Sequence, residues 1–227
     1  MDNVPVITID GPAGAGKGTI AASLAQYFSW NILDSGALYR LTAYSALQKS
    51  CSFEDERALA NIARNLDIEF TPNADGLVEP ILEGVNVSRE IRSETAGEAA
   101  SKVASVSQVR DALLQRQRDF AKAPGLVCDG RDMGTVVFPN ASLKIYLTAS
   151  AEVRAQRRLK QLKDHGLNAT LAGLIEEIQD RDFRDKNRSH APLVPAGDAI
   201  EVDTSDLSIE SVVTKIIDLY ESKVSTS

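Results

Sequence analysis

The feature that most constrains this chain is a glycine-rich segment directly after an apolar run. Residues 4–9 read VPVITI, a β-branched stretch typical of a buried parallel strand. The segment Gly11 to Thr19, GPAGAGKGT, follows at once and matches the pattern GxxxxGK. Apolar residues then recur at helical spacing from Ile20 to Phe28. A strand, a glycine loop and a helix in this order are the context of a phosphate-binding loop.

Glycines let backbone N–H groups converge on phosphate oxygens at a helix N-terminus, where the helix dipole favours anions. We therefore expect the loop to bind a nucleoside triphosphate, with Lys17 placing its charge on the β and γ phosphates. A turn that binds nothing is disfavoured, because the glycines, the lysine and both flanking elements agree. The predicted contacts are Gly11, Pro12, Ala13, Gly14, Ala15, Gly16, Lys17, Gly18 and Thr19.

The residue after Lys17 is Gly18, where such loops usually carry Ser or Thr, and the hydroxyl is displaced to Thr19. This GKGT order is typical of nucleoside monophosphate kinases. Thr19 is the one possible direct metal ligand from the protein, and we predict no other.

Strand and helix patterns alternate along the rest of the chain, which predicts an α/β fold with a parallel sheet covered on both faces. Residues 68–87 differ: short β-type runs broken by turn residues predict a small antiparallel excursion. The polar tail, residues 222–227, is expected to fray. The other expected strands are residues 31–33, 126–128, 143–148 and 199–202, and the helices are 38–48, 54–65, 98–121, 151–164, 170–187 and a last one through 209–220.

Charge and composition exclude several classes of function. The formal net charge of −7 argues against a nucleic-acid coat and a polybasic membrane binder. Cys51 and Cys128 lack metal-ligand spacing, and Cys128 is expected to be a buried thiol. No apolar stretch is long enough to span a bilayer. We expect a cytoplasmic protein with no nucleic-acid or membrane partner.

A phosphate loop alone does not separate a GTPase switch, a motor ATPase and a metabolite kinase. The DxxG and NKxD segments of a GTPase are not found. A motor ATPase usually places a glutamate after an apolar strand to activate water. Here the run 126–128 ends in Asp129-Gly130-Arg131-Asp132. An arginine beside the phosphates suits a second anionic substrate better than water.

More arginines share one helix face further on. Arg181, Arg184 and Arg188 lie at i, i+3 and i+7, with Asp185 four residues after the first. The commoner meaning of such a pattern is a solvated, salt-bridged surface. We favour that surface interpretation for Arg184, and also for Arg154 and Arg158 in the preceding helix.

Five segments together resemble bacterial-type cytidylate kinases over essentially the whole chain. DGRDMGTVVFPNA is the most diagnostic, and it also argues against a kinase for another acceptor such as shikimate. The absent GTPase segments and the surplus of arginines argue against a regulatory nucleotide-binding protein. The segments are ITIDGPAGAGKGT (7–19), LDSGALYR (33–40), DGRDMGTVVFPNA (129–141), RDFRDKNR (181–188) and APLVPA (191–196).

The resemblance implies a doubly wound, five-stranded parallel sheet in a single domain, 1–227. It divides the chain into a core, 1–35 and 98–227, and a monophosphate-binding insert, 36–97, that holds the antiparallel sheet. A short lid covers about 157–168. The implied reaction is phosphoryl transfer from ATP to CMP or dCMP with Mg²⁺, by a monomer.

The resemblance also implies roles for individual residues. The pattern leaves open an exchange of a member or two between the base and phosphate groups. Asp129 is expected to orient arginines or a metal-bound water, and Asp10 is not assigned to the site. The base readers are Ser35, Arg110 and Asp132; the acceptor-phosphate ligands are Arg40, Arg131 and Arg188; Ser101, Arg181 and Asp185 lie near the sugar; Lys17, Arg131, Arg188 and the lid residue Arg157 act in catalysis.

Overall fold

The computed structural model describes residues 4–72, 78–91, 93–164 and 168–225. Five strands form one sheet in the order β2-β6-β1-β7-β8, and every neighbouring pair is parallel. This confirms the predicted α/β class with a five-stranded parallel sheet. The strands are β1 (Val6–Asp10), β2 (Asn31–Asp34), β6 (Leu126–Gly130), β7 (Leu143–Thr148) and β8 (Ile200–Asp203).

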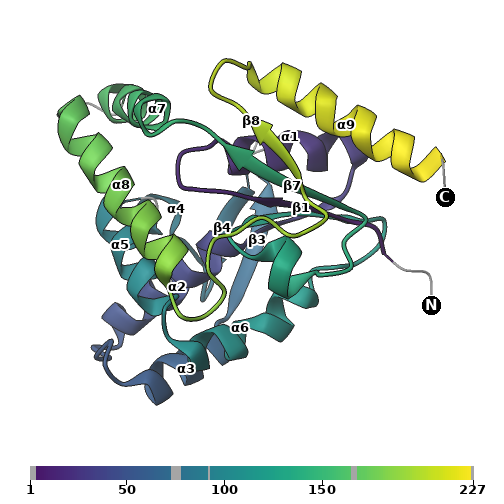
Figure 1. Cartoon of the computed structure of the whole chain (residues 1–227). Coiled ribbons are helices and arrows are strands. Elements are labelled where there is room, and N and C mark those ends of the chain that lie inside the picture. The colour runs from purple at the N-terminus through teal and green to yellow at the C-terminus, as the bar shows by residue number, and fades with distance from the viewer. Residues whose placement is uncertain (1–3, 73–77, 92, 165–167, 226–227) are drawn as a thin grey trace.

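Helices cover both faces of the sheet, because the strands are apolar on both sides. On one face Ile7 and Ile9 pack with α1 (Lys17–Phe28) and α9 (Ile209–Ser225). On the other face, Leu126 and Cys128 share a core with α2 (Ser35–Gln48). Figure 1 shows α1 and α9 together on one side, with α2 on the other. Cys128 is fully buried, as predicted.

Further helices and a second sheet extend the α2 side. Helix α2 packs against α5 (Glu94–Val103), and α3 (Glu56–Arg64) packs against α6 (Ser107–Arg118). The predicted antiparallel excursion is confirmed as a three-stranded sheet in the order β3-β4-β5. Its strands are β3 (Ile68–Pro72), β4 (Val78–Leu82) and β5 (Val85–Asn86), and α4 (Ser88–Ile91) follows.

Two sequence predictions about helices are wrong. The helix expected over 98–121 is two helices, α5 and α6, separated at residues 104–106. The Ser105 hydroxyl donates to the Lys102 carbonyl and Val106 is extended, so the backbone leaves the helix there. The tail 222–227, expected to fray, is helical as far as Ser225, and residues 226–227 lie outside the described residues. The hydroxyls of Ser222 and Ser225 donate to backbone carbonyls one turn earlier.

The connections after β6 and β7 carry the remaining elements. A single turn of π-helix, η1 (Met133–Val137), follows β6, and β7 leads into α7 (Ala151–Asp164). Helix α8 (Leu171–Asn187) packs against α7, and the two lie side by side at one edge of the molecule (Figure 1). The predicted lid begins within α7, and its residues 165–167 lie outside the described residues. Among the described helices, none is both long and apolar enough to span a bilayer.

Gly125, just before β6, offers a test of the packing under β2. A Cβ built there would lie 2.3 Å from Trp30 Cδ2, and that ring is itself packed between Phe28 and Tyr220. We expect Gly125→Ala to lower the free energy of unfolding by about 1–3 kcal/mol, measured by urea denaturation. Gly197→Ala is the control, because a Cβ there meets nothing within 4 Å. Equal effects of the two substitutions would contradict this account.

Candidate active site

The glycine loop, residues 11–19, joins the carboxyl end of β1 to α1, and its glycines are required by geometry. Gly11 has φ +148°, and a Cβ there would lie 2.2 Å from the Leu147 carbonyl oxygen of β7. Gly14 and Gly16 have φ values of +78° and +93°, which side chains with a Cβ rarely adopt. Gly11 therefore lets the loop pass over the end of β7, and Gly14 and Gly16 allow the left-handed backbone that follows.

Four carbonyl groups of this loop, those of residues 12, 13, 15 and 16, accept hydrogen bonds within the protein. Lys17 Nζ donates to Pro12 O at 2.7 Å, and Arg154 Nη1 donates to Ala13 O at 3.1 Å. Thr204 Oγ1 donates to Ala15 O at 3.3 Å, and the Ile20 amide donates to Gly16 O. The first N–H groups of α1 have no acceptor within the helix. The loop is thus arranged to offer N–H donors to an anion.

Lys17 and Asp129 are both buried beside the loop, and the charge of each affects the pKa of the other. Burial lowers the pKa of the Lys17 amine, the Arg131 charge lowers it further, and Asp129 opposes both. Burial also raises the pKa of the Asp129 carboxyl, with repulsion from Asp34 adding to it. Asp129 Oδ1 is buried and has no hydrogen-bond partner among the described residues. A ligand that places negative charge beside Lys17, or positive charge beside Asp129, would therefore stabilise the charged form of that side chain.

A cluster of arginines and aspartates, which we call the acceptor cluster, lies beyond this pair: Arg110, Arg131, Asp132, Asp185 and Arg188. Arg131 Nε donates to Asp185 Oδ2 at 2.8 Å, and Arg110 donates to Asp132 Oδ2. Arg188 Nη2 lies 3.8 Å from Asp132 Oδ1. Burial raises the pKa of Asp185, but the ion pair with Arg131 outweighs it and the net pKa is lowered. Both carboxylates hold guanidinium groups in place.

A cavity of about 190 Å³ opens beside the acceptor cluster. Its lining includes Arg110, Asp132, Tyr39 and Gln117, with apolar contact from Val136 and Val137. Arg110 lies over the Tyr39 ring, 5.7 Å from its centroid. The cavity thus combines an aromatic wall, a carboxylate and a guanidinium, a combination that suits a polar planar ring.

Ser35 reaches this cavity through another side chain. Its hydroxyl donates to Gln117 Oε1 at 2.7 Å, both residues are buried, and Gln117 lines the cavity. Gln117 was missed by the sequence analysis. The one signal was its place on the helix of Arg110, two turns further on, which puts both side chains on the same face.

Asp10 is the second residue that the sequence analysis did not place. It ends β1, and its two carboxylate oxygens accept the amides of Met133 and Gly134 at 2.8 and 2.7 Å. Burial raises its pKa to about 6, against the lowering effect of these two bonds. Asp10 therefore fixes the start of η1, and with it the backbone next to Asp132. The sequence signal that could have indicated this role is an acidic residue directly after an apolar strand.

Three other residues predicted for the site, Arg40, Ser101 and Arg181, lie on α2, α5 and α8. Arg40 is half-buried on α2, with Nη2 3.9 Å from the position that a Gly36 Cβ would take. Ser101 lies on α5, and Arg181 Nη1 lies 3.6 Å from the position of a Gly97 Cβ. The Arg40 charge lowers the pKa of Asp129 and the Arg181 charge lowers that of Asp185, so both guanidinium groups lie near the site.

Arg157 lies on the other side, against the loop after β8. Its guanidinium donates to Thr204 Oγ1 at 3.1 Å and to Thr204 O at 2.6 Å. Through Thr204 it supports the Ala15 carbonyl of the glycine loop. Its predicted contact with ATP stays a prediction.

The surface interpretation of Arg154 is wrong. This side chain is 4% exposed and bonds both oxygens of Asp182 at 3.0 and 2.6 Å. Helix periodicity did not show that the Arg154 side of α7 packs against the glycine loop and α8. Arg184, given the same interpretation, is exposed.

Comparison with known proteins agrees with this geometry. The family model described as cytidylate kinase matches residues 7–222. A cytidylate kinase of Proteus mirabilis is 53% identical over 97% of each chain, and one of Vibrio vulnificus is 54% identical over 97% of each. Among solved structures, a shikimate kinase from Bacteroides thetaiotaomicron gives a TM-score of 0.47 at 13% identity, covering 96% of this chain and 99% of that one. That distant likeness says nothing about the acceptor. With the family model spanning nearly its whole length, the chain belongs to the cytidylate kinase family.

Proposed function

We propose that this protein transfers the γ-phosphoryl group of ATP to CMP or dCMP, giving CDP or dCDP. The observation that carries the proposal is the pairing of two anion sites. The glycine loop with Lys17 lies beside a cluster of arginines, Arg110, Arg131 and Arg188. Arg110 of this cluster lines a cavity fit for a planar base. A donor phosphate chain and an acceptor monophosphate would meet between them.

The acceptor phosphate is itself the nucleophile, so the chemistry needs positioning and charge more than a general base. Two unit charges of like sign about 4 Å apart repel by roughly 4 kcal/mol at an effective dielectric of about 20. Lys17, Arg131, Arg188 and Arg40 offset this repulsion. The planar guanidinium of Arg131, aimed by Asp185, also fixes the direction of the attacking oxygen.

The cavity beside Asp132 would select the base. Cytosine carries an amino donor where uracil carries a carbonyl acceptor, and a carboxylate accepts from the former and repels the latter. Arg110, held by Asp132, donates to the neighbouring acceptors of the ring. Ser35 contributes from behind Gln117, and Ser101, Arg181 and Asp185 border the sugar.

The donor set also fits Mg²⁺, which prefers oxygen ligands and keeps several of its waters. The buried Asp129 Oδ1 without a described partner offers one oxygen, and the Thr19 hydroxyl on the first turn of α1 offers another. A bound Mg²⁺ would neutralise charge on the β and γ phosphates. Among the described residues, no three or more His, Cys, Asp or Glu side chains group as a metal site.

We also expect the site to exclude water during the reaction. A lid over about 157–168 and the insert over 36–97 would close on both substrates, so that ATP is not hydrolysed without an acceptor. We propose a cytoplasmic location, because Cys51 and Cys128 are both free thiols and the cytoplasm keeps thiols reduced.

The monomeric state stays a prediction.

The direct test is ADP release from ATP and Mg²⁺ with a panel of CMP, dCMP, UMP, AMP, GMP, dTMP and shikimate. We expect CMP and dCMP to stimulate release strongly, and ATP alone to be turned over slowly. Absence of stimulation by CMP would refute the proposed function. Rapid ADP release without any acceptor would show that ATP hydrolysis does not depend on closure over both substrates.

Asp132→Asn tests base selection. The amide can present its NH₂ group to the uracil carbonyl, so the preference for CMP over UMP should narrow by about 5- to 150-fold, the equivalent of about 1–3 kcal/mol. The measurement is the ratio of kcat/KM for the two acceptors. Asp119→Asn, an exposed change at the end of α6, is the control and should leave the ratio unchanged. An unaltered ratio in Asp132→Asn would show that this carboxylate does not read the base.

Lys17→Met tests the donor side. Methionine keeps the buried aliphatic stem but removes the charge from the β and γ phosphates. We expect kcat to fall by about 100- to 1,000-fold, the usual loss when one such electrostatic contact is removed. CMP affinity, measured by calorimetry, should change little. Full activity in Lys17→Met would exclude the assigned role.

A further inference from the structure

Arg154 joins three segments that are far apart in the sequence. Its Nε donates to Ala149 O at 3.0 Å, two residues before its own helix begins. Its Nη1 donates to Ala13 O at 3.1 Å, in the glycine loop, and also to Asp182 Oδ1 at 3.0 Å on α8. Nη2 donates to Asp182 Oδ2 at 2.6 Å. One planar guanidinium therefore contacts the donor loop and α8 at once.

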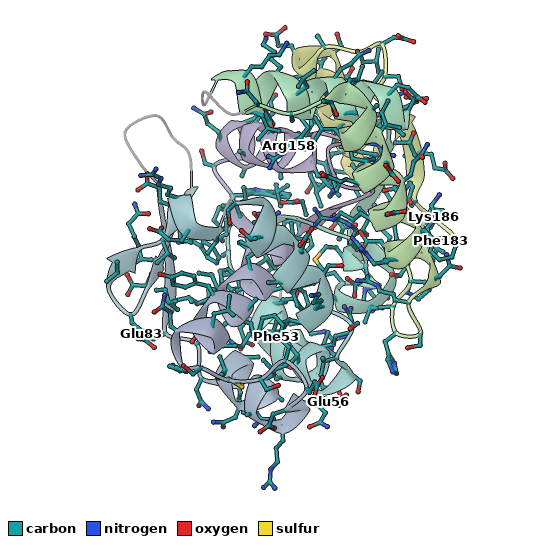
Figure 2. The ribbon with its side chains drawn as sticks, turned by 90° about the vertical axis from the view of Figure 1, so that its left-hand side faces the viewer. Phe53, Glu56, Glu83, Arg158, Phe183 and Lys186 are labelled. Carbon is teal, nitrogen blue, oxygen red and sulfur yellow. The ribbon has the colours of Figure 1, made fainter. Side chains whose placement is uncertain are left out.

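Asp182 lies on α8, which carries Asp185 of the acceptor cluster and ends just before Arg188. Arg181 precedes it directly, and Asp185 and Arg188 follow at three and six residues. Phe183 and Lys186 point to the outside of α8 in Figure 2, and Phe183 is 68% exposed. Two carboxylates of α8 thus face the body of the protein: Asp182 accepts from Arg154, and Asp185 accepts from Arg131.

We propose that Arg154 is a positioning residue that couples the two substrate sites through Asp182. This deepens the proposed function and rests on it. ATP in the glycine loop would fix the Ala13 carbonyl, and with it the Arg154 guanidinium. The guanidinium then holds Asp182 and α8, so Arg131, through Asp185, and Arg188 are oriented for the acceptor phosphate. Neither Arg154 nor Asp182 need touch a substrate.

The geometry requires arginine at this position. Lysine has one nitrogen at its tip and cannot meet Ala13 O, Ala149 O and both Asp182 oxygens together, whereas the guanidinium fork does so in one plane. The loop also leaves little room for another arrangement. A Cβ at Gly14 would lie 3.1 Å from Arg154 Cβ, so the backbone of the loop rests on the base of this side chain. The ion pair is buried, with side-chain exposures of 4% and 17%, so water screens it little.

A purely structural role would make a different prediction. Breaking a buried ion pair destabilises a protein and lowers the folded fraction. That loss scales activity but does not alter the ratio of two dissociation constants measured on folded protein. A coupling role does alter that ratio, because coupling between two ligands is reciprocal and is defined by it.

The experiment measures CMP binding by calorimetry, with and without a saturating non-hydrolysable ATP analogue and Mg²⁺. The coupling factor is the ratio of the two dissociation constants. In the unaltered protein we expect CMP to bind at least about 5-fold more tightly with the analogue, the low end of typical couplings. In Arg154→Lys and in Asp182→Asn the factor should fall to between about 1 and 2, with CMP affinity alone changed by less than about 2-fold.

Two matched controls and a double variant complete the test. Arg184→Lys and Asp180→Asn make the same chemical changes at exposed positions of α8, and both should keep the full coupling factor. The double variant Arg154→Lys/Asp182→Asn should lose no more coupling than either single variant, because the two side chains act as one unit. Thermal unfolding identifies any variant that is not folded at the assay temperature.

The outcomes separate this inference from the proposed function. If the unaltered protein does not phosphorylate CMP, the proposed function fails. If it does, but CMP binding ignores the ATP analogue or Arg154→Lys and Asp182→Asn both retain the coupling factor, the inference is refuted and the function stands. Loss of coupling in both single variants, with both controls intact, supports it.

Discussion

The site depends on buried carboxylates that hold arginine side chains in place before any anion arrives. Guanidinium groups gathered at one point repel one another, and burial removes the water that would screen them. Asp185 holds Arg131, and Asp132 holds Arg110 with Arg188 nearby. A chain of net charge −7 can therefore contain a cationic site, because its carboxylates are part of that site.

The need to hold charged side chains in place also accounts for the two aspartates at the ends of β1 and β6. The carboxyl ends of β1 and β6 are neighbours in the sheet, where Asp10 lies opposite Gly130 and Asp129 lies opposite Ile9. Asp10 accepts two backbone amides of η1, which fixes the chain next to Asp132. Asp129 keeps an oxygen without a described partner beside Lys17. Asp10 thus has a structural role, whereas Asp129 keeps an oxygen that a ligand can use.

The sequence was informative where a local pattern has one physical meaning. The glycine loop is such a case, because positive φ angles, and at Gly11 the close approach to Leu147, strongly favour glycine. The parallel sheet is another, because β-branched runs alternating with helices have few other arrangements. The fold class and the loop were therefore predictable without a structure. Most candidate site residues, by contrast, came from the resemblance.

The errors arose where a side chain's meaning depends on distant packing. Arg154 has the spacing of a surface residue, and only the placement of α7 against the glycine loop buries it. Gln117 was missed because its partner, Ser35, lies 82 residues away. The break between α5 and α6 depends on a serine hydroxyl competing for a backbone carbonyl. Such contacts leave no periodic signal along the chain.

The glycine loop itself shows why the site is a property of the whole core. A peptide group that turns its N–H toward a phosphate turns its carbonyl away, and that carbonyl needs a partner. For Ala13 and Ala15 the partners are Arg154 and Thr204, 141 and 189 residues further along the chain. The motif can therefore be read from nine residues, but its conformation is held by α7 and the segment after β8. Anion binding by this loop follows from the folded core as much as from the motif.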